Sequence, residues 1–175
     1  MSTPANDPGI AFELDDELVT AQPGETIWSA ARRHGVLIPH LCHSDGLRPD
    51  GNCRACVVEI EGERTLAPSC CRTPAPGQKV RAQSPRARKS QDLVLELLLA
   101  DLPAQGHKWN GDDAALPHGE LSAWAARQGV TPRASLTALR REPPAADLSH
   151  PAMAVNLDAC IQCNRCQRAC REAQG

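Results

Sequence analysis

At 175 residues, the chain is long enough for one domain or two small ones, and with 2% aromatic residues its cores contain few large side chains and depend partly on bound metal. The formal net charge of −2 indicates no particular partner, and nucleic acid is not expected as one because no aromatic residues interleave with the bases. Nine cysteines occur without an N-terminal export signal, so we predict a cytoplasmic protein whose thiols bind metals.

The first predicted elements are a hairpin and a helix. Residues 10–14 alternate apolar and polar side chains, as a half-buried strand does, and residues 18–20 return as the second strand. Residues 27–34 have apolar side chains at helical spacing, and Gly35 ends this helix.

Three further strands are predicted at residues 56–60, 65–67 and 79–82, the first two joined by a turn at residues 61–63. The order is strand, strand, helix, loop, hairpin and edge strand, which gives a small mixed sheet wrapped around one helix. We therefore predict an α+β fold of the β-grasp ferredoxin kind.

Four cysteines within this region have the spacing C-x10-C-x2-C-x13-C. Thiolates in such a set hold either zinc or an iron–sulfur cluster. Cluster sulfurs accept hydrogen bonds from backbone N–H groups, so the loop must permit close approach, and Gly46, Gly51 and Ala55 permit it. We predict a [2Fe-2S] cluster, with zinc as the alternative. The predicted ligands are Cys42, Cys53, Cys56 and Cys70.

A second helix is predicted to begin at Ser84 and Pro85, which suit the N-cap and the first turn. A leucine-rich stripe within residues 93–99 is predicted to be core, packing this helix between two cluster domains. The apolar stretch 93–102 contains two acids and is too short to span a bilayer, so we predict no membrane insertion.

Residues 102–151 are rich in Pro, Gly, Ala and charge and have the composition of a linker. One short helix is predicted over 120–128, ended by Gly129, with an apolar face that includes Trp124. The segment 64–91 contains seven bases and no acid, and forms either a solvated face or a docking surface for a partner subunit.

The last motif has the spacing C-x2-C-x2-C-x3-C, the run that bacterial ferredoxins use for [4Fe-4S] clusters. Zinc sites rarely take a third cysteine two residues after a C-x2-C pair. Arg165, Arg168 and Arg171 lie among these cysteines, where they either offset cluster charge or are simply solvated. The predicted ligands are Cys160, Cys163, Cys166 and Cys170.

Residues 10–100 resemble the N-terminal [2Fe-2S] domain shared by the large iron–sulfur subunit of complex I, the small diaphorase subunit of NAD-reducing hydrogenases and the α subunit of NAD-dependent formate dehydrogenases. The resemblance rests on the cysteine spacing and on the phrase GNCRACVVEI at 51–60. Thirteen residues before the fourth ligand is the pattern of these families, which implies Cys70, and not Cys71, as that ligand.

The same families supply one histidine and three cysteines to another cluster in the segment that follows. This sequence has no cysteine between Cys71 and Cys160, so that site is expected to be absent. His107 and His118 are predicted to be surface histidines.

The phrase SHPAMAVNLDACIQC at 149–163 most resembles formate dehydrogenase α subunits. That resemblance implies a second [4Fe-4S] run and a molybdenum- or tungsten-pterin domain downstream. We therefore expect the 175 residues to be the front part of a longer chain, in which Cys170 serves the next cluster. The alternative is that all four cysteines bind one cluster.

The predicted organisation is a [2Fe-2S] β-grasp domain at 8–83, a helix and irregular linker at 84–150, and the start of a [4Fe-4S] ferredoxin domain at 151–175. The predicted function is electron transfer between a pterin site and a flavin- and NAD-binding partner subunit, as part of an oxidoreductase. No catalytic acid–base pair, nucleophile or phosphate loop is present, so no active site is assigned. The alternatives are a sibling subunit of an NAD-reducing hydrogenase or NADH dehydrogenase, and a zinc-binding interaction protein.

Overall fold

The computed structural model describes residues 9–103, 119–155 and 157–175. The chain divides into two units, Met1–Gln91 and Asp92–Gly175, which are described separately. His107 and His118 lie outside the described residues.

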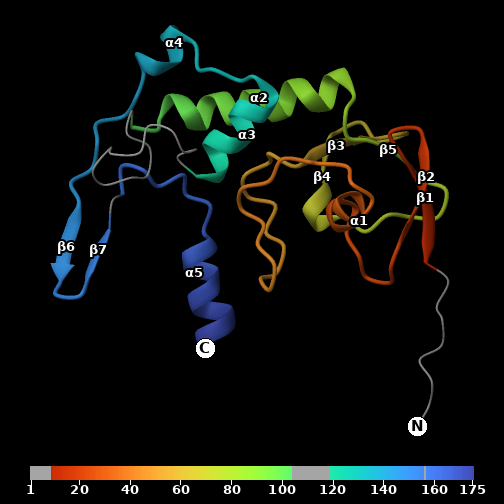
Figure 1. Cartoon of the computed structure of the whole chain (residues 1–175), viewed down its shortest axis with the longest axis horizontal. Helices are drawn as coiled ribbons and strands as arrows, with labels where there is room; N and C mark the ends of the chain where they lie inside the picture. Colours follow the sequence, from red (N-terminus) through yellow and green to blue (C-terminus); the bar gives the residue numbers. More distant parts are fainter. Residues whose placement is uncertain (1–8, 104–118, 156) are drawn as a thin grey trace. The chain divides into compact units, whose positions relative to one another are not determined.

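The first unit contains a five-stranded mixed sheet of order β2-β1-β5-β3-β4 (Figure 1). Strand β1 pairs antiparallel with β2 and parallel with β5, and β3 lies antiparallel to both β5 and β4. This confirms the predicted mixed, ferredoxin-like sheet, but the last strand, predicted to lie at an edge, is central, because β5 pairs with β1 on one side and β3 on the other. The strands are β1 (Ile10–Leu14), β2 (Glu17–Ala21), β3 (Val57–Ile60), β4 (Ala67–Pro68) and β5 (Lys79–Arg81).

Asp15 and Asp16 form the turn between β1 and β2, with φ angles of 48° and 69°. Asp tolerates this left-handed conformation better than most residues. The Asp15 carboxylate also accepts hydrogen bonds from the backbone N–H groups of Ala82 (2.7 Å) and Gln83 (3.1 Å). The hairpin turn is thereby attached to the end of β5.

Helix α1 (Ile27–Arg33) packs with the sheet around a common core. The Thr26 side chain accepts a hydrogen bond from the backbone N–H of Ser29 (3.2 Å), so Thr26 is the N-cap. Gly35, at φ 80°, follows the end of the helix as predicted. The largest fully buried apolar side chains of this core are Phe12, Leu14, Ile27, Val58 and Val80.

Helix α2 (Pro85–Ala100) begins as predicted, because the Ser84 hydroxyl accepts a hydrogen bond from the backbone N–H of Ala87 (3.1 Å). Its buried face follows the predicted leucine stripe only in part. Leu93 and Leu97 are 39% and 55% exposed, whereas Leu95 is fully buried.

The buried positions of α2 begin with Ala87, Gln91 and Leu95, four residues apart along one line of the helix. Gln91 is fully buried, and its Nε2 donates hydrogen bonds to the carbonyl oxygens of Val57 (2.9 Å) and Ala82 (3.2 Å). A polar side chain therefore occupies a central position on the face that attaches the start of α2 to the sheet.

The second unit contains short elements. Helix α3 (Glu120–Gln128) has the predicted bounds, and Gly129 caps it in the left-handed conformation at φ 69°. The structure has more elements than predicted after α3, namely a short helix α4 (Ala134–Thr137) and a hairpin of β6 (Asp147–His150) and β7 (Met153–Val155). The chain continues through α5 (Arg165–Ala169) and the π-helical turn η2 (Cys170–Gln174). None of the helices in the described part of the chain has the length and apolar character needed to cross a membrane.

Candidate metal centres

The first cysteine set is supplied by three segments of the first unit. Cys42 follows α1 and its connecting loop, Cys53 and Cys56 lie on the loop that enters β3, and Cys70 lies in the 3-10 turn η1 (Ser69–Cys71). Cys42, Cys56 and Cys70 are almost completely buried, and Cys53 is half-buried. Residues up to 28 apart in sequence thus meet in one place.

Two pairs of sulfurs can be distinguished in this set. Cys42 and Cys53 form a reciprocal pair, in which the backbone nitrogen of each residue lies 3.4 Å from the Sγ of the other and donates a hydrogen bond to it. The Sγ atoms of Cys56 and Cys70 lie 3.3 Å apart. The Cys42 thiol also interacts with the Cys70 thiol, so the two pairs adjoin.

The backbone of the loop is shaped to turn N–H groups toward sulfur. Gly51 and Arg54 have φ angles of 64° and 59°, and for Arg54 this conformation is uncommon. Backbone N–H groups of Asn52 and Ala55 face the sulfurs of Cys42 and Cys53 respectively. Left-handed residues at a ligand loop are the kind of backbone strain that functional sites retain.

The turn that carries Cys70 is attached to Cys56. The carbonyl oxygen of Cys56 accepts hydrogen bonds from both the backbone N–H (3.1 Å) and the hydroxyl (2.6 Å) of Ser69, which is fully buried. This double contact fixes the distance between the segments that carry Cys56 and Cys70.

An aromatic group supports the loop around Cys42, and sequence reasoning had missed it. Trp28 is buried in α1, and its Nε1 donates a hydrogen bond to the carbonyl oxygen of Ile38 (3.2 Å). Its ring centroid lies 4.5 Å from that of His40 and 4.4 Å from that of His43. Trp28 is not among the residues whose spacing predicts the helix, and its two histidine neighbours lie 12 and 15 residues further along the chain, so no local pattern indicates this contact.

The sulfur contacts split the pKa values of the four thiols. Contact with the Cys53 thiol, and then with the Cys70 thiol, lowers the pKa of Cys42, and contact with the Cys70 thiol lowers the pKa of Cys56 to about 7. Contact with the Cys42 thiol is the main cause that raises the pKa of both Cys53 and Cys70.

This split provides a test of whether a cluster fits the site. Hydrogen bonds between the thiols hold Cys42 and Cys56 toward the thiolate and Cys53 and Cys70 toward the neutral form, and four thiolates packed together would repel one another. Deprotonation of all four therefore needs positive charge among them, and the irons of a cluster supply it. The donor set of three buried sulfurs and one half-buried sulfur, with backbone N–H groups turned toward them, fits a [2Fe-2S] cluster.

Cys71 lies beside the set and differs from it in exposure. Its Sγ is 3.6 Å from the Sγ of Cys70, but Cys71 is exposed whereas Cys70 is fully buried. The buried thiol of this pair is the one at contact distance from Cys56.

The second cysteine set lies in the second unit and near its surface. Cys160, Cys166 and Cys170 are exposed and Cys163 is half-buried. No sulfur–sulfur contact joins these four in the described part of the chain. Across residues 9–103, 119–155 and 157–175, no group of three or more His, Cys, Asp or Glu side chains is arranged around a single ion.

The loop between these cysteines nevertheless has an unusual backbone. Gln162 and Asn164 adopt φ angles of 55° and 59°, and the backbone N–H of Gln162 lies 3.4 Å from the Sγ of Cys160. Alternating left-handed residues direct N–H groups to one side of a loop, where they can face sulfur. The local geometry thus resembles that of the first ligand loop, although the sulfurs do not meet.

Two consecutive arginines hold the segment that enters this loop. Arg140 donates to both carboxylate oxygens of Asp158 at 2.7 Å. Arg141 pairs with Asp101 at 3.0 Å, and its Nη2 lies within 3.5 Å of the carbonyl oxygens of Leu157, Asp158 and Cys160. Bidentate and charge-assisted contacts of this kind fix geometry well. The pair had not been singled out from the sequence, because their partners lie 16 to 40 residues away.

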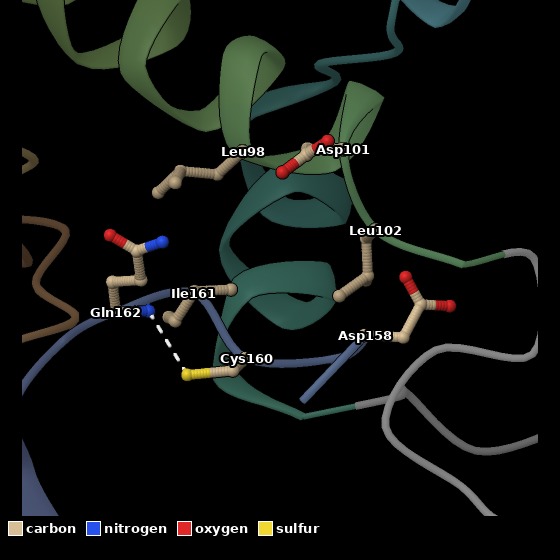
Figure 2. A pocket seen from close by; sticks show the side chains of 7 residues that line it. All are labelled: Leu98, Asp101, Leu102, Asp158, Cys160, Ile161 and Gln162. Carbon is tan, nitrogen blue, oxygen red and sulfur yellow. Dashed lines mark hydrogen bonds between the residues drawn. The ribbon is translucent and has the colours of Figure 1, made fainter. Parts of the chain in front are cut away.

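A pocket of about 230 Å³ adjoins Cys160 (Figure 2). Figure 2 shows the apolar side chains of Leu98, Leu102 and Ile161 around it. The remaining lining residues are Asp101, Asp158, Cys160 and Gln162. Since both acids are paired with arginines, the pocket presents mainly an apolar wall beside the Cys160 loop.

The arginines among the last cysteines are not all solvated. Arg165 forms an ion pair with Glu120 at the start of α3, and Arg168 is buried, with 8% of its surface exposed. Arg171 is exposed. The alternative of three simply solvated arginines is therefore wrong for Arg168.

Comparison with known proteins agrees with the geometry of the first unit. Residues 7–85 match the family described as 2Fe-2S iron-sulfur cluster binding domain. The chain is 30% identical over 173 residues to an NADH-quinone oxidoreductase subunit of Rhizobium meliloti (strain 1021), covering 95% of this chain and 19% of the relative. It is 31% identical to an NADP-reducing hydrogenase subunit of Solidesulfovibrio fructosivorans, covering 94% of this chain and 28% of the relative.

A solved structure extends the likeness to the fold. The chain superimposes on a chain of an NAD+-reducing [NiFe]-hydrogenase with a TM-score of 0.77 at 30% identity, covering 95% of this chain and 67% of that one. Against the curated relatives above, it spans only 19% to 28% of their length. The chain therefore belongs to the family of iron–sulfur electron-transfer regions found in NADH-quinone oxidoreductase and NAD-reducing hydrogenase subunits, with a [2Fe-2S] binding domain over residues 7–85.

Proposed function

We propose that the chain conducts electrons through two clusters, a [2Fe-2S] cluster in the first unit and a [4Fe-4S] cluster in the second. The observation that carries the proposal is the meeting of four buried or half-buried sulfurs from three segments of the first unit. Cluster iron exchanges one electron at a time, and the protein sets its potential through hydrogen bonds, charge and burial.

In the first unit, the two sulfur pairs suggest which ligands share an iron. Cys42 and Cys53 form one pair and Cys56 and Cys70 the other. The fully buried Cys70, and not the exposed Cys71, is assigned as the fourth ligand.

In the second unit, Cys160, Cys163, Cys166 and Cys170 are the proposed [4Fe-4S] ligands. The support is their spacing and the left-handed Gln162, whose N–H faces the Cys160 sulfur. A cubic cluster binds each thiolate to a separate iron, so its ligands need not touch one another. Cys170 is either the fourth ligand of this cluster or a ligand of a different one. The EPR measurement that counts the clusters also distinguishes these two roles.

The test is a measurement on the anaerobically purified chain. Iron and sulfide analysis with EPR of the reduced protein should give two distinct signals. Cys56→Ala should remove the [2Fe-2S] signal alone, and Cys163→Ala the [4Fe-4S] signal alone. Cys170→Ala removes the second signal if Cys170 belongs to that cluster and leaves it otherwise. A colourless preparation that binds zinc would refute the electron-transfer function.

The finer proposal is that the chain is the electron-transfer region of a formate dehydrogenase α subunit, located in the cytoplasm. It rests on the resemblance of residues 149–163 to that family. In this proposal, electrons pass from a downstream pterin domain through the clusters to a flavin- and NAD-binding partner. The competing proposal, a hydrogenase or NADH dehydrogenase subunit, has the named relatives in its favour. Formate-dependent NAD reduction by the full-length assembly would select the first, and hydrogen-dependent reduction the second.

The partner's docking surface was predicted at the basic segment 64–91. Four of its bases, Arg72, Lys79, Arg81 and Arg86, pair with acids of the same unit, which reduces the positive charge available to a partner. Lys89 is exposed on the first turns of α2. We therefore choose Lys89→Glu as the sharper test, and unchanged binding of the flavin subunit at low salt would rule out this surface.

A further inference from the structure

The first cysteine set contains one sulfur more than a [2Fe-2S] cluster needs. The Sγ of Cys71 lies 3.6 Å from that of Cys70, which in turn lies 3.3 Å from that of Cys56. Cys70 is fully buried and Cys71 is exposed. A fifth thiol thus lies on the solvent side of the proposed ligands and in contact with one of them.

Gly51 leaves space for this fifth thiol. A Cβ atom at position 51 would lie 3.0 Å from the Sγ of Cys71, too close for a normal contact. The ligand loop that carries Cys53 and Cys56 therefore passes directly under the Cys71 sulfur. Cys71 is near the proposed ligands in space as well as in sequence.

The local structure allows the two sulfurs to exchange places. Cys70 and Cys71 are consecutive residues of η1, a single 3-10 turn. A change of one χ1 rotamer moves a cysteine sulfur by about 3 Å. That movement is similar to the 3.6 Å that separates the two sulfurs, so a rotamer change with a small adjustment of the turn brings Cys71 to the Cys70 position.

We propose that Cys71 is an alternative iron ligand of the [2Fe-2S] site and replaces Cys70 when the Cys70 sulfur leaves. This inference rests on the cluster assigned to the first unit under the proposed function. In the exchange, the Cys71 thiol passes its proton to the departing Cys70 thiolate and its sulfur forms the bond to iron that Cys70 gives up. No electron is gained or lost.

The test compares three variants of the full chain, each purified without oxygen. Cys70→Ala should keep most of the [2Fe-2S] EPR signal with changed g values, because Cys71 supplies the fourth sulfur. Cys70→Ala combined with Cys71→Ala should lose the signal, because only three cysteine sulfurs remain at the site. Cys56→Ala is the matched control: it removes a buried ligand that has no adjacent cysteine, and should lose the signal to the same extent.

Alkylation gives a second readout that does not depend on cluster yield. In the wild-type chain with its cluster bound, iodoacetamide should modify the exposed Cys71. In Cys70→Ala the same thiol should be protected, because its sulfur is bound to iron. Peptide mass spectrometry measures the modified fraction, and far-UV circular dichroism verifies that the sheet is intact.

The inference is overturned if Cys70→Ala loses the signal as fully as Cys56→Ala while the sheet remains folded. It is also overturned if the double variant keeps the signal, or if Cys71 stays reactive in Cys70→Ala. A wild-type chain without a [2Fe-2S] signal contradicts the proposed function itself, so the two failures can be told apart.

Discussion

Cys42, Cys56 and Cys70 are almost completely buried beside the core of the first unit, whereas Cys160, Cys166 and Cys170 are exposed on a loop and a short helix of the second. The first set is brought together by a five-stranded sheet and its helix. The second is held mainly by ion pairs and a left-handed backbone. Packing therefore positions the first set of ligands before metal binds, while the second set depends more on the metal for its final arrangement.

A large cavity in the core of the first unit should produce the greatest difference in cluster binding between the two cysteine sets. Phe12 is fully buried in β1, so Phe12→Ala should lower the free energy of unfolding of the first unit by about 3–5 kcal/mol. Hydrogen exchange of the β1 and β5 amides measures the loss. The [2Fe-2S] signal should weaken and the [4Fe-4S] signal persist.

The control for that variant is Leu18→Ala in the neighbouring strand β2. Leu18 is 81% exposed, so its truncation should have little effect on exchange or on either signal. Equal weakening of both signals in Phe12→Ala would show that the two sets do not differ in their dependence on the core.

The arginine contacts provide the converse test. Arg141→Ala removes the ion pair with Asp101 and the contact with the Cys160 carbonyl, and should reduce iron affinity at the second set by about 10–100-fold. Titration with a chelator, followed by EPR, measures this loss. Arg127→Ala, which removes a cation lying over the Trp124 ring, is the control. If the second cluster of Arg141→Ala resists the chelator as well as that of wild type, the Arg141 contacts do not contribute to iron binding at the second set.

A smaller effect is expected from the cap of α1. Thr26→Ala removes the acceptor for the Ser29 N–H and should destabilise the first unit by about 1 kcal/mol. Thr26→Ser keeps the hydroxyl and should restore most of that loss. Denaturant unfolding followed by circular dichroism measures both, and equal stability of the Ala and Ser variants would exclude the cap as the cause.

The smallest effect is a pH dependence confined to the second unit. Hydrogen bonds from the Arg133 side chain lower the pKa of Glu96 below its usual range. A carboxyl whose pKa is lowered by folding stabilises the folded state above its ordinary pKa, and that contribution is lost as pH falls through the lowered value. Thermal unfolding of wild type and Glu96→Gln should therefore differ at pH 7 and converge in acid. A difference that stays constant with pH would exclude this ion pair.

Much of the first unit could be predicted because its signals are local. The alternation at 10–14 and the glycine after residue 34 identify β1 and the end of α1, and the structure has both. Gly129 likewise predicted the end of α3. The cysteine spacing identified the set that the structure brings together in the first unit.

The rest could not be predicted, since it depends on partners distant in sequence. The leucine stripe predicted the buried face of α2 only in part, since Leu95 is buried but Leu93 and Leu97 are exposed. Burial of Gln91, a polar residue, depends on two backbone acceptors that only the folded sheet supplies. Arg140 and Arg141 are two charged residues in a linker-like segment until Asp101 and Asp158 are placed beside them. The left-handed backbone conformations of Arg54 and Gln162 also cannot be predicted from residue type.

The two hydrogen bonds from Ser69 to the carbonyl of Cys56 have a kinetic consequence. They restrain the start of β3 and the following turn against separation, so a change in charge of the proposed cluster would move the Cys56 and Cys70 sulfurs apart only slightly. Small nuclear displacement means low reorganisation energy. The speed of an electron hop would then be governed by its driving force and by the gap to the next carrier.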